Sequence, residues 1–111
     1  MRKIVRVNGK KVLLDTDKDV CLYDATHAFY KRTGNQNNLN RGVDLYARER
    51  GLDNPVFYEL HWSRYQGEVD YIEVLTPEEA ARFIEQNFDV FDDDDIETLK
   101  RLGLFNPDEV I

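Results

Sequence analysis

Apolar and polar positions in the first two thirds of the chain alternate in a way that predicts short strands. Two runs rich in β-branched residues, 3–7 and 10–14, flank Asn8-Gly9, the pair that a type I′ hairpin turn requires. Further strands are expected at residues 20–23, 43–50, 56–62 and 69–75. Because short turns separate most of these segments, the pattern predicts an antiparallel meander of about five strands.

The expected strand 56–62 shows the alternation most clearly. One of its sides carries Val56, Tyr58, Leu60 and Trp62, and the other carries Phe57, Glu59 and His61. In the next strand Ile72 and Val74 share one face, while Tyr71 and Glu73 share the other. We therefore expect Trp62 in the core and His61 on the less buried face of the sheet.

Two interpretations of residues 24–34 remain open. Asp24 can cap a helix that runs through Ala28 and Phe29 and stops at Gly34, or the segment can be a turn followed by a strand over residues 28–32. Of the two, the turn and strand is favoured. The segment 34–38 that follows is a loop by its Gly and Asn content.

The period changes from two to 3.6 after residue 75. Thr76, Pro77 and Glu79 form a capping box with proline at the first helical position, which predicts a helix over 76–88. A second helix, 96–102, is expected behind a capping box of Asp94 and Glu97. Its end is predicted at Gly103, a left-handed cap that brings Leu104 onto Leu99. Residues 106–109 look like a third helix start.

Length predicts one small domain over residues 1–111, and the pattern of strands and helices makes its class α+β. The chain has 41% hydrophobic residues and no apolar run near the ~20 residues of a membrane span. Its basic start lacks the apolar segment of a signal peptide, and a lone Cys21 has no internal disulfide partner. We therefore expect a cytoplasmic protein.

Charge is distributed very unevenly along the chain. Residues 1–54 carry 11 Lys/Arg and 7 Asp/Glu, whereas residues 55–111 carry 4 Lys/Arg and 15 Asp/Glu. Between Glu68 and Glu97 there are twelve carboxylates and one base, Arg82. A single-sign field of this size attracts cations or basic partners and repels nucleic acid and anionic membranes.

The run of four Asp at residues 92–95 is the densest charge. Capping of a helix N-terminus and solvation explain part of it, because free N–H groups and the helix dipole favour carboxylates there. A partner-binding acidic face is the functional alternative, and a divalent-ion site is a third. Trp62, Arg64 and Tyr65 belong to residue types enriched in binding hot spots, and we expect Arg64 and Tyr65 to be exposed.

Other candidate chemistry is weaker. Residues 15–19 open like a calcium loop, but Val20 and Thr26 stand where that loop needs Gly and Glu, which favours a plain surface loop. Cys21 and His27, with Asp24, form only a remote candidate for a thiolate–imidazole pair. A sheet face carrying Lys31, Arg32, Arg48 and Arg50 would suit a phosphate backbone.

Three short segments resemble a group of short uncharacterised bacterial and phage proteins. They are Leu22-Tyr23-Asp24, then Leu45-Tyr46, then Leu75-Thr76-Pro77-Glu78-Glu79-Ala80, and the resemblance covers roughly residues 20–86. It implies a small sheet with a helix packed on it, often in a mobile-element context, and no established activity. The chain departs from the group in its N-terminal hairpin and its Asp-rich C-terminal helix.

These observations predict a fold and a function class. The fold is α+β: a meander of about five strands, a helix on one face and a second short C-terminal helix. The function is a non-catalytic acidic module that binds a basic protein, in a mobile-element setting an inhibitor that mimics nucleic-acid charge. Nucleic-acid or nucleotide binding through the basic strands is the alternative, a homodimer is compatible with both, and no cofactor, metal, membrane or catalytic residue is expected. The expected partner-binding residues are Glu85, Asp89, Asp92, Asp93, Arg64 and Tyr65.

Overall fold

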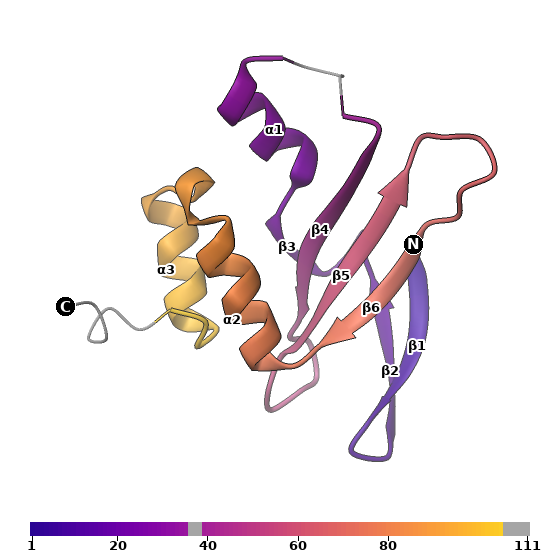
Figure 1. Cartoon of the computed structure of the whole chain (residues 1–111). Helices are drawn as coiled ribbons and strands as arrows, with labels where there is room; N and C mark the ends of the chain where they lie inside the picture. The colour runs from indigo at the N-terminus through magenta and orange to yellow at the C-terminus, as the bar shows by residue number, and fades with distance from the viewer. Residues whose placement is uncertain (36–38, 106–111) are drawn as a thin grey trace.

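A four-stranded sheet lies between a layer of helices and a separate β-hairpin in the computed structural model, which describes residues 1–35 and 39–105 (Figure 1). The strands are β1 (Arg2–Val7), β2 (Lys10–Asp15), β3 (Val20–Tyr23), β4 (Arg41–Arg48), β5 (Val56–Ser63) and β6 (Tyr71–Leu75). The helices are α1 (Ala25–Thr33), α2 (Pro77–Gln86), the 3-10 turn η1 (Phe88–Val90) and α3 (Asp93–Arg101). The predicted α+β class is confirmed.

The central sheet has the order β3-β4-β5-β6, and all its neighbours are antiparallel. Strand β4 pairs with β5 from Arg41↔Ser63 to Arg48↔Val56, and β5 pairs with β6 from Phe57↔Leu75 to His61↔Tyr71. The last three strands form the expected meander, while α1 is inserted between β3 and β4. Alternate residues of each strand face the helices or the hairpin.

The helix layer packs on one face of this sheet. Its core joins sheet residues to apolar positions of all three α-helices or the segments that follow them. The members are Leu22, Tyr23, Ala25, Ala28, Leu45, Ala47, Phe57, Leu75, Ala80, Ile84, Leu99, Leu102 and Leu104. Burial of these side chains fixes the inner side of each helix, so the polar sides of α2 and α3 face outward.

The hairpin β1–β2 packs on the opposite face instead of extending the sheet. Val12 and Leu14 of β2 bury their side chains against Val56, Tyr58 and Ile72. The predicted turn is confirmed, because Asn8 and Gly9 both have positive φ, 50° and 80°. The expectation of one continuous meander therefore differs from the structure, in which six strands divide into sheets of two and four.

Residues 25–33 form a helix, so the favoured turn and strand is wrong. Asp24 accepts a hydrogen bond from the backbone N–H of His27, and Asp44 accepts one from that of Ala25. Gly34 closes the helix in the left-handed conformation at φ 75°. The Asp44 contact stabilises the first turn from a strand 19 residues away, and local pattern alone does not reveal it.

The C-terminal helices have the predicted character, with one shifted start. The Thr76–Glu79 capping box is present in α2. Helix α3 is capped by Asp92 and Asp95, not by Asp94 and Glu97. Asp92 and Asp95 have the same three-residue spacing as the predicted pair, two residues earlier. A helix that starts there is longer and has three carboxylates in its first turn, where the helix dipole favours them.

The end of α3 is as predicted, with Leu104 N–H donating to the Leu99 carbonyl and Gly103 N–H to that of Lys100. Trp62 is half-buried and packs against the core on the helix side of the sheet. The alternation predicts it on the same face as Val56 and Tyr58, which instead pack on the hairpin side. The expected helix start at 106–109 lies outside the described residues. Among the described residues, no helix is long and apolar enough to cross a bilayer.

Candidate functional site

The four carboxylates expected to bind a partner all lie in the helix layer. Glu85 is exposed on α2, and Asp93 is exposed in the first turn of α3. Asp89 belongs to η1, and Asp92 is the residue that caps α3. The structure therefore gathers them in one layer, but their surroundings differ.

Asp89 is held by an internal ion pair. The guanidinium of Arg32, on α1, donates to both of its carboxylate oxygens, at 2.8 Å and 2.7 Å. These hydrogen bonds lower the pKa of Asp89. The neighbouring Lys31 ammonium donates to the Val90 carbonyl at 2.7 Å, so the basic end of α1 is fastened to η1. The charge of Asp89 is thus largely used within the molecule.

Asp92 is also engaged, through its capping box. Its carboxylate accepts from the backbone N–H of Asp95 at 2.9 Å, and the Asp95 carboxylate accepts from that of Asp92 at 3.0 Å. Hydrogen bonding to the Asp95 N–H lowers the pKa of Asp92. Capping therefore occupies two of the four Asp in the run.

Four other acidic residues of this layer have no such partner and form a candidate binding surface. Within the described residues, no ion pair or side-chain hydrogen bond is made by the carboxylates of Glu78, Glu85, Asp93 and Asp94. All four residues are exposed. We call them the acidic surface.

Arg64 and Tyr65 lie in the loop after β5, at the upper right of Figure 1, whereas α3 lies at the left. Both are exposed, as predicted. The Arg64 guanidinium lies 5.7 Å from the centre of the Trp62 ring, and that of Arg41 lies 4.6 Å from the centre of the Tyr65 ring. The structure does not bring this pair together with the acidic residues of α3.

The basic sheet face proposed from Lys31, Arg32, Arg48 and Arg50 does not form. Lys31 and Arg32 lie on a helix. Arg48 donates to the carbonyls of Leu13 and Arg50, and Arg50 pairs with Asp19 at 2.7 Å. Each of these four cations donates a hydrogen bond to an acceptor on another segment of the chain, and so links two elements of the fold.

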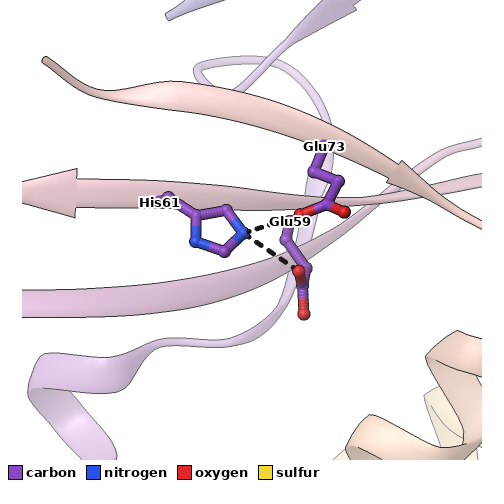
Figure 2. Close-up of side chains that lie close together, drawn as sticks. All are labelled: Glu59, His61 and Glu73. Atoms are coloured by element: carbon purple, nitrogen blue, oxygen red, sulfur yellow. Dashed lines mark hydrogen bonds and ion pairs between the residues drawn. The ribbon is translucent and has the colours of Figure 1, made fainter.

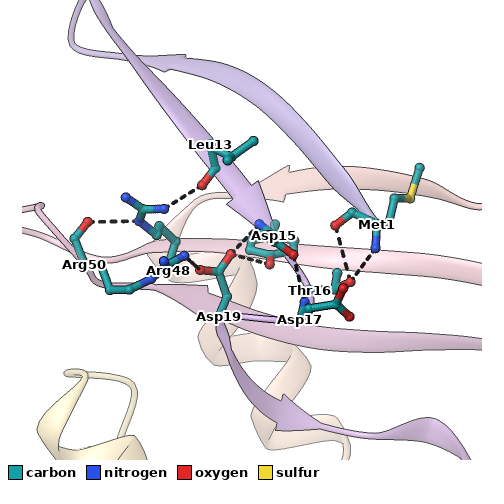
Figure 3. Close-up of polar contacts among 9 residues, drawn as sticks. Met1, Leu13, Asp15, Thr16, Asp17, Asp19, Arg48 and Arg50 are labelled. Carbon is teal, nitrogen blue, oxygen red and sulfur yellow. Dashed lines mark hydrogen bonds and ion pairs between the residues drawn. The ribbon is translucent and has the colours of Figure 1, made fainter.

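Figure 3 shows the hydrogen bonds and ion pairs made by residues of the 15–19 loop. Asp19, whose side chain is fully buried, accepts from Tyr58 Oη at 2.6 Å, from the Asp15 N–H at 2.8 Å and from Arg50. Burial raises the pKa of Asp19, but these hydrogen bonds outweigh it, and the net shift is downward. The loop is a structural joint between hairpin and sheet, in agreement with the plain-loop interpretation.

Cys21, Asp24 and His27 line one pocket with Phe91 and Asp95. Burial of the sulfur, together with the charges of Asp44 and Asp24, raises the pKa of the Cys21 thiol to about 11. A thiol of that pKa is protonated at neutral pH, which is the reverse of what a nucleophilic cysteine needs. Asp24 is occupied as the cap of α1.

A histidine with two carboxylates forms a second polar cluster, which the sequence did not single out (Figure 2). The Nε2 atom of His61 lies 3.0 Å from Glu59 Oε1 and 3.3 Å from Glu73 Oε2. Glu59 and Glu73 are directly paired across β5 and β6. The alternation predicts that Glu59 and His61 share one face of their strand, and that Tyr71 and Glu73 share one face of theirs. Only the register between β5 and β6 shows that these two faces are the same side of the sheet.

A pocket of about 440 Å³ opens beside this cluster. It is lined by Arg41, Val43, His61, Trp62 and Tyr71, among others. The His61 ring is stacked on that of Tyr71, with 4.4 Å between centres and 5° between planes. Stacking holds the imidazole at the border between cluster and pocket.

Comparison with family models, with curated proteins and with solved structures finds no match to this chain.

Proposed function

We propose that this protein is a non-catalytic binding protein whose acidic surface docks a basic partner protein. The observation that carries the proposal is the set of four exposed carboxylates on α2 and α3 that the described residues do not neutralise. Capping and ion pairing explain Asp92, Asp95 and Asp89, but not these four. A protein cation can approach them from solvent at little desolvation cost.

The placement of charge across the sheet supports the same function. Residues 76–105, which contain α2, η1 and α3, have nine acidic and three basic residues, a net charge of −6. The hairpin residues 2–11 contain five Lys or Arg and no acid. Because the sheet separates the two layers, the hairpin cations do not screen the carboxylates of α2 and α3 (Figure 1).

Negative groups along two helices resemble the charge, though not the covalent structure, of a nucleic-acid backbone. A protein site that binds phosphates with Lys and Arg would also accept carboxylates held in rows. We therefore propose a nucleic-acid-binding protein as the partner and inhibition by charge mimicry as the outcome, in the mobile-element setting that the resemblance implies. A reducing cytoplasm remains the compartment that we propose.

Salt-dependent binding of an arginine-rich peptide tests the acidic surface. The variant Asp93→Asn/Asp94→Asn removes two charges and leaves the Asp92–Asp95 capping box in place. We expect about two- to tenfold weaker binding and a shallower dependence on ionic strength. The matched control Asp17→Asn/Asp53→Asn removes two exposed charges elsewhere and should bind like the wild type.

The outer side of the hairpin supports a second candidate, nucleic-acid binding. Arg6 pairs with Lys11 across the ribbon, and the exposed Ile4 pairs with Leu13 beside them. Within the described residues, Arg6 and Lys11 form no ion pair. If duplex DNA binds and Arg6→Gln/Lys11→Gln abolishes that binding, the hairpin is the functional surface, and the acidic surface then serves mainly for solubility.

A further inference from the structure

Strands β5 and β6 place two like charges directly opposite each other. Glu59 and Glu73 are partners in the antiparallel register, where side chains approach most closely and like charges destabilise the sheet. The Glu59 side chain is only 16% exposed, so water screens it weakly. Such a pair needs a cation between its carboxylates.

His61 supplies a nitrogen at that position. It lies two residues after Glu59 on the same face of β5, and its Nε2 faces both carboxylates (Figure 2). One ligand atom from each of the three side chains lies within 4.8 Å of the other two. A nitrogen placed between two carboxylates in this way can form a salt bridge with them, and the three groups can equally bind one metal ion.

The distances agree with tetrahedral coordination. Zinc ligands lie about 2.0–2.2 Å from the ion, which puts neighbouring ligands of a tetrahedral site about 3.3–3.6 Å apart. The two nitrogen–oxygen distances, 3.0 Å and 3.3 Å, are close to such an edge. The third edge, between the carboxylate oxygens of Glu59 and Glu73, is at most 4.8 Å, and the exposed Glu73 side chain is free to move to shorten it.

We propose that Glu59, His61 and Glu73 bind a divalent transition-metal ion, with Zn²⁺ as the best fit. One imidazole and two carboxylates suit a borderline cation, whereas Ca²⁺ and Mg²⁺ prefer oxygen ligands alone. A divalent charge also offsets both carboxylates at once, which a single imidazolium does only in part.

Three protein ligands leave a fourth position for water or a small anion. Glu73 is 57% exposed, so the cluster is open on that side. His61 also lines the pocket that contains Arg41, Trp62 and Tyr71. The pocket would admit a small ligand to the neighbourhood of the ion; its Arg41 is paired with Glu68, which also lines it.

Titration calorimetry of the metal-free full chain with Zn²⁺ tests this site. We expect one ion per chain, and at least tenfold weaker binding by both His61→Gln and Glu73→Gln. The matched control is His27→Gln, which changes the other histidine and should bind Zn²⁺ like the wild type. His27 lies on α1 beside Cys21, so this control also tests the competing pocket.

A second measurement needs no variant. In NMR spectra of the wild-type protein, Zn²⁺ should shift the ring signals of His61 and leave those of His27 in place. Binding that survives His61→Gln but is lost in His27→Gln or in Asp93→Asn/Asp94→Asn overturns the proposal, as does the absence of any His61 shift at saturating Zn²⁺. Neither result depends on whether the acidic surface binds a basic protein.

Discussion

The helix layer and the hairpin cover opposite faces of the same sheet. They pack on it in the same way but differ in the charge of their outer sides. Each buries one apolar side, around Ile84 and Leu99 in the helices and around Val12 and Leu14 in the hairpin. Their outer sides have opposite charge. The comparison shows how burial converts a charge asymmetry along the chain into one across the molecule: apolar residues decide which side faces the sheet, and the charged residues then face outward.

The two layers also differ in how they can be recognised from sequence. Helices carry start and stop signals within a few residues, such as Thr76 with Glu79 and Gly103 with Leu104, and both were predicted. A hairpin carries a turn signal, Asn8-Gly9, but nothing local says whether it extends a sheet or stacks on one.

Truncation of a buried side chain in either layer gives the largest expected effect. Ile84→Ala and Leu14→Ala each remove a side chain that is at most 1% exposed, and each should lower the free energy of unfolding by about 2–5 kcal/mol. Chemical denaturation measures both. The control Ile4→Ala, at a side chain 65% exposed, should change it little. A neutral Leu14→Ala would mean that the hairpin does not pack on the sheet.

The joint between hairpin and sheet should respond to acid. Replacement of Asp19 by Asn leaves its three donors with a weaker acceptor and should cost about 1–3 kcal/mol at neutral pH. Because the pKa of Asp19 is lowered in the folded state, its contribution is complete above the unfolded pKa of about 3.9 and is lost as the pH falls through the folded value. Denaturation at a series of pH values should show the wild type and Asp19→Asn converging below about pH 4. Parallel curves would contradict this role.

Loss of a helix cap should cost less. Thr76→Ala removes the side-chain acceptor for the Glu79 N–H and is expected to destabilise the protein by about 1 kcal/mol. Thermal or chemical unfolding detects a change of this size. Thr76→Ser, which keeps the hydroxyl, should restore most of the stability, whereas equal losses in both variants would show that the methyl group matters instead.

The smallest expected effect concerns Cys21, on β3. Since the pKa of its thiol is raised to about 11, alkylation by iodoacetamide should be slow at pH 7 and should keep accelerating as the pH rises towards 11. Cys21→Ser should leave binding to the arginine-rich peptide unchanged. A reaction rate that levels off below pH 8 would place this cysteine among reactive thiols.

Patterns within one segment were sufficient for most of the fold, and the errors come from contacts between segments or from a local spacing that occurs more than once. The helix 25–33 depends on Asp44, which belongs to the next strand. Asp92 replaces Asp94 as a cap because residues 92–97 offer the capping-box spacing twice, as Asp92 with Asp95 and as Asp94 with Glu97.

The candidate site shows the same limit. The exposure of Arg64 and Tyr65 follows from their position at a turn, and it was predicted; Glu85 and Asp93 are exposed on their helices. The ion pair between Arg32 and Asp89 joins residues 57 positions apart, and the meeting of Glu59 with Glu73 depends on strand register. Neither leaves a signal in the spacing of residues along the chain.

NMR mapping with a cationic peptide shows directly whether the acidic surface is the binding surface. Titration of the ¹⁵N-labelled protein with an arginine-rich peptide at low salt should shift the amide signals of Glu85, Asp93 and Asp94, and the shifts should fade as salt is added. The signals of Arg6 and Lys11 in the hairpin should stay in place. Shifts confined to the loop around Arg64 and Tyr65, or no shifts at low salt, would mean that the acidic surface does not bind the peptide.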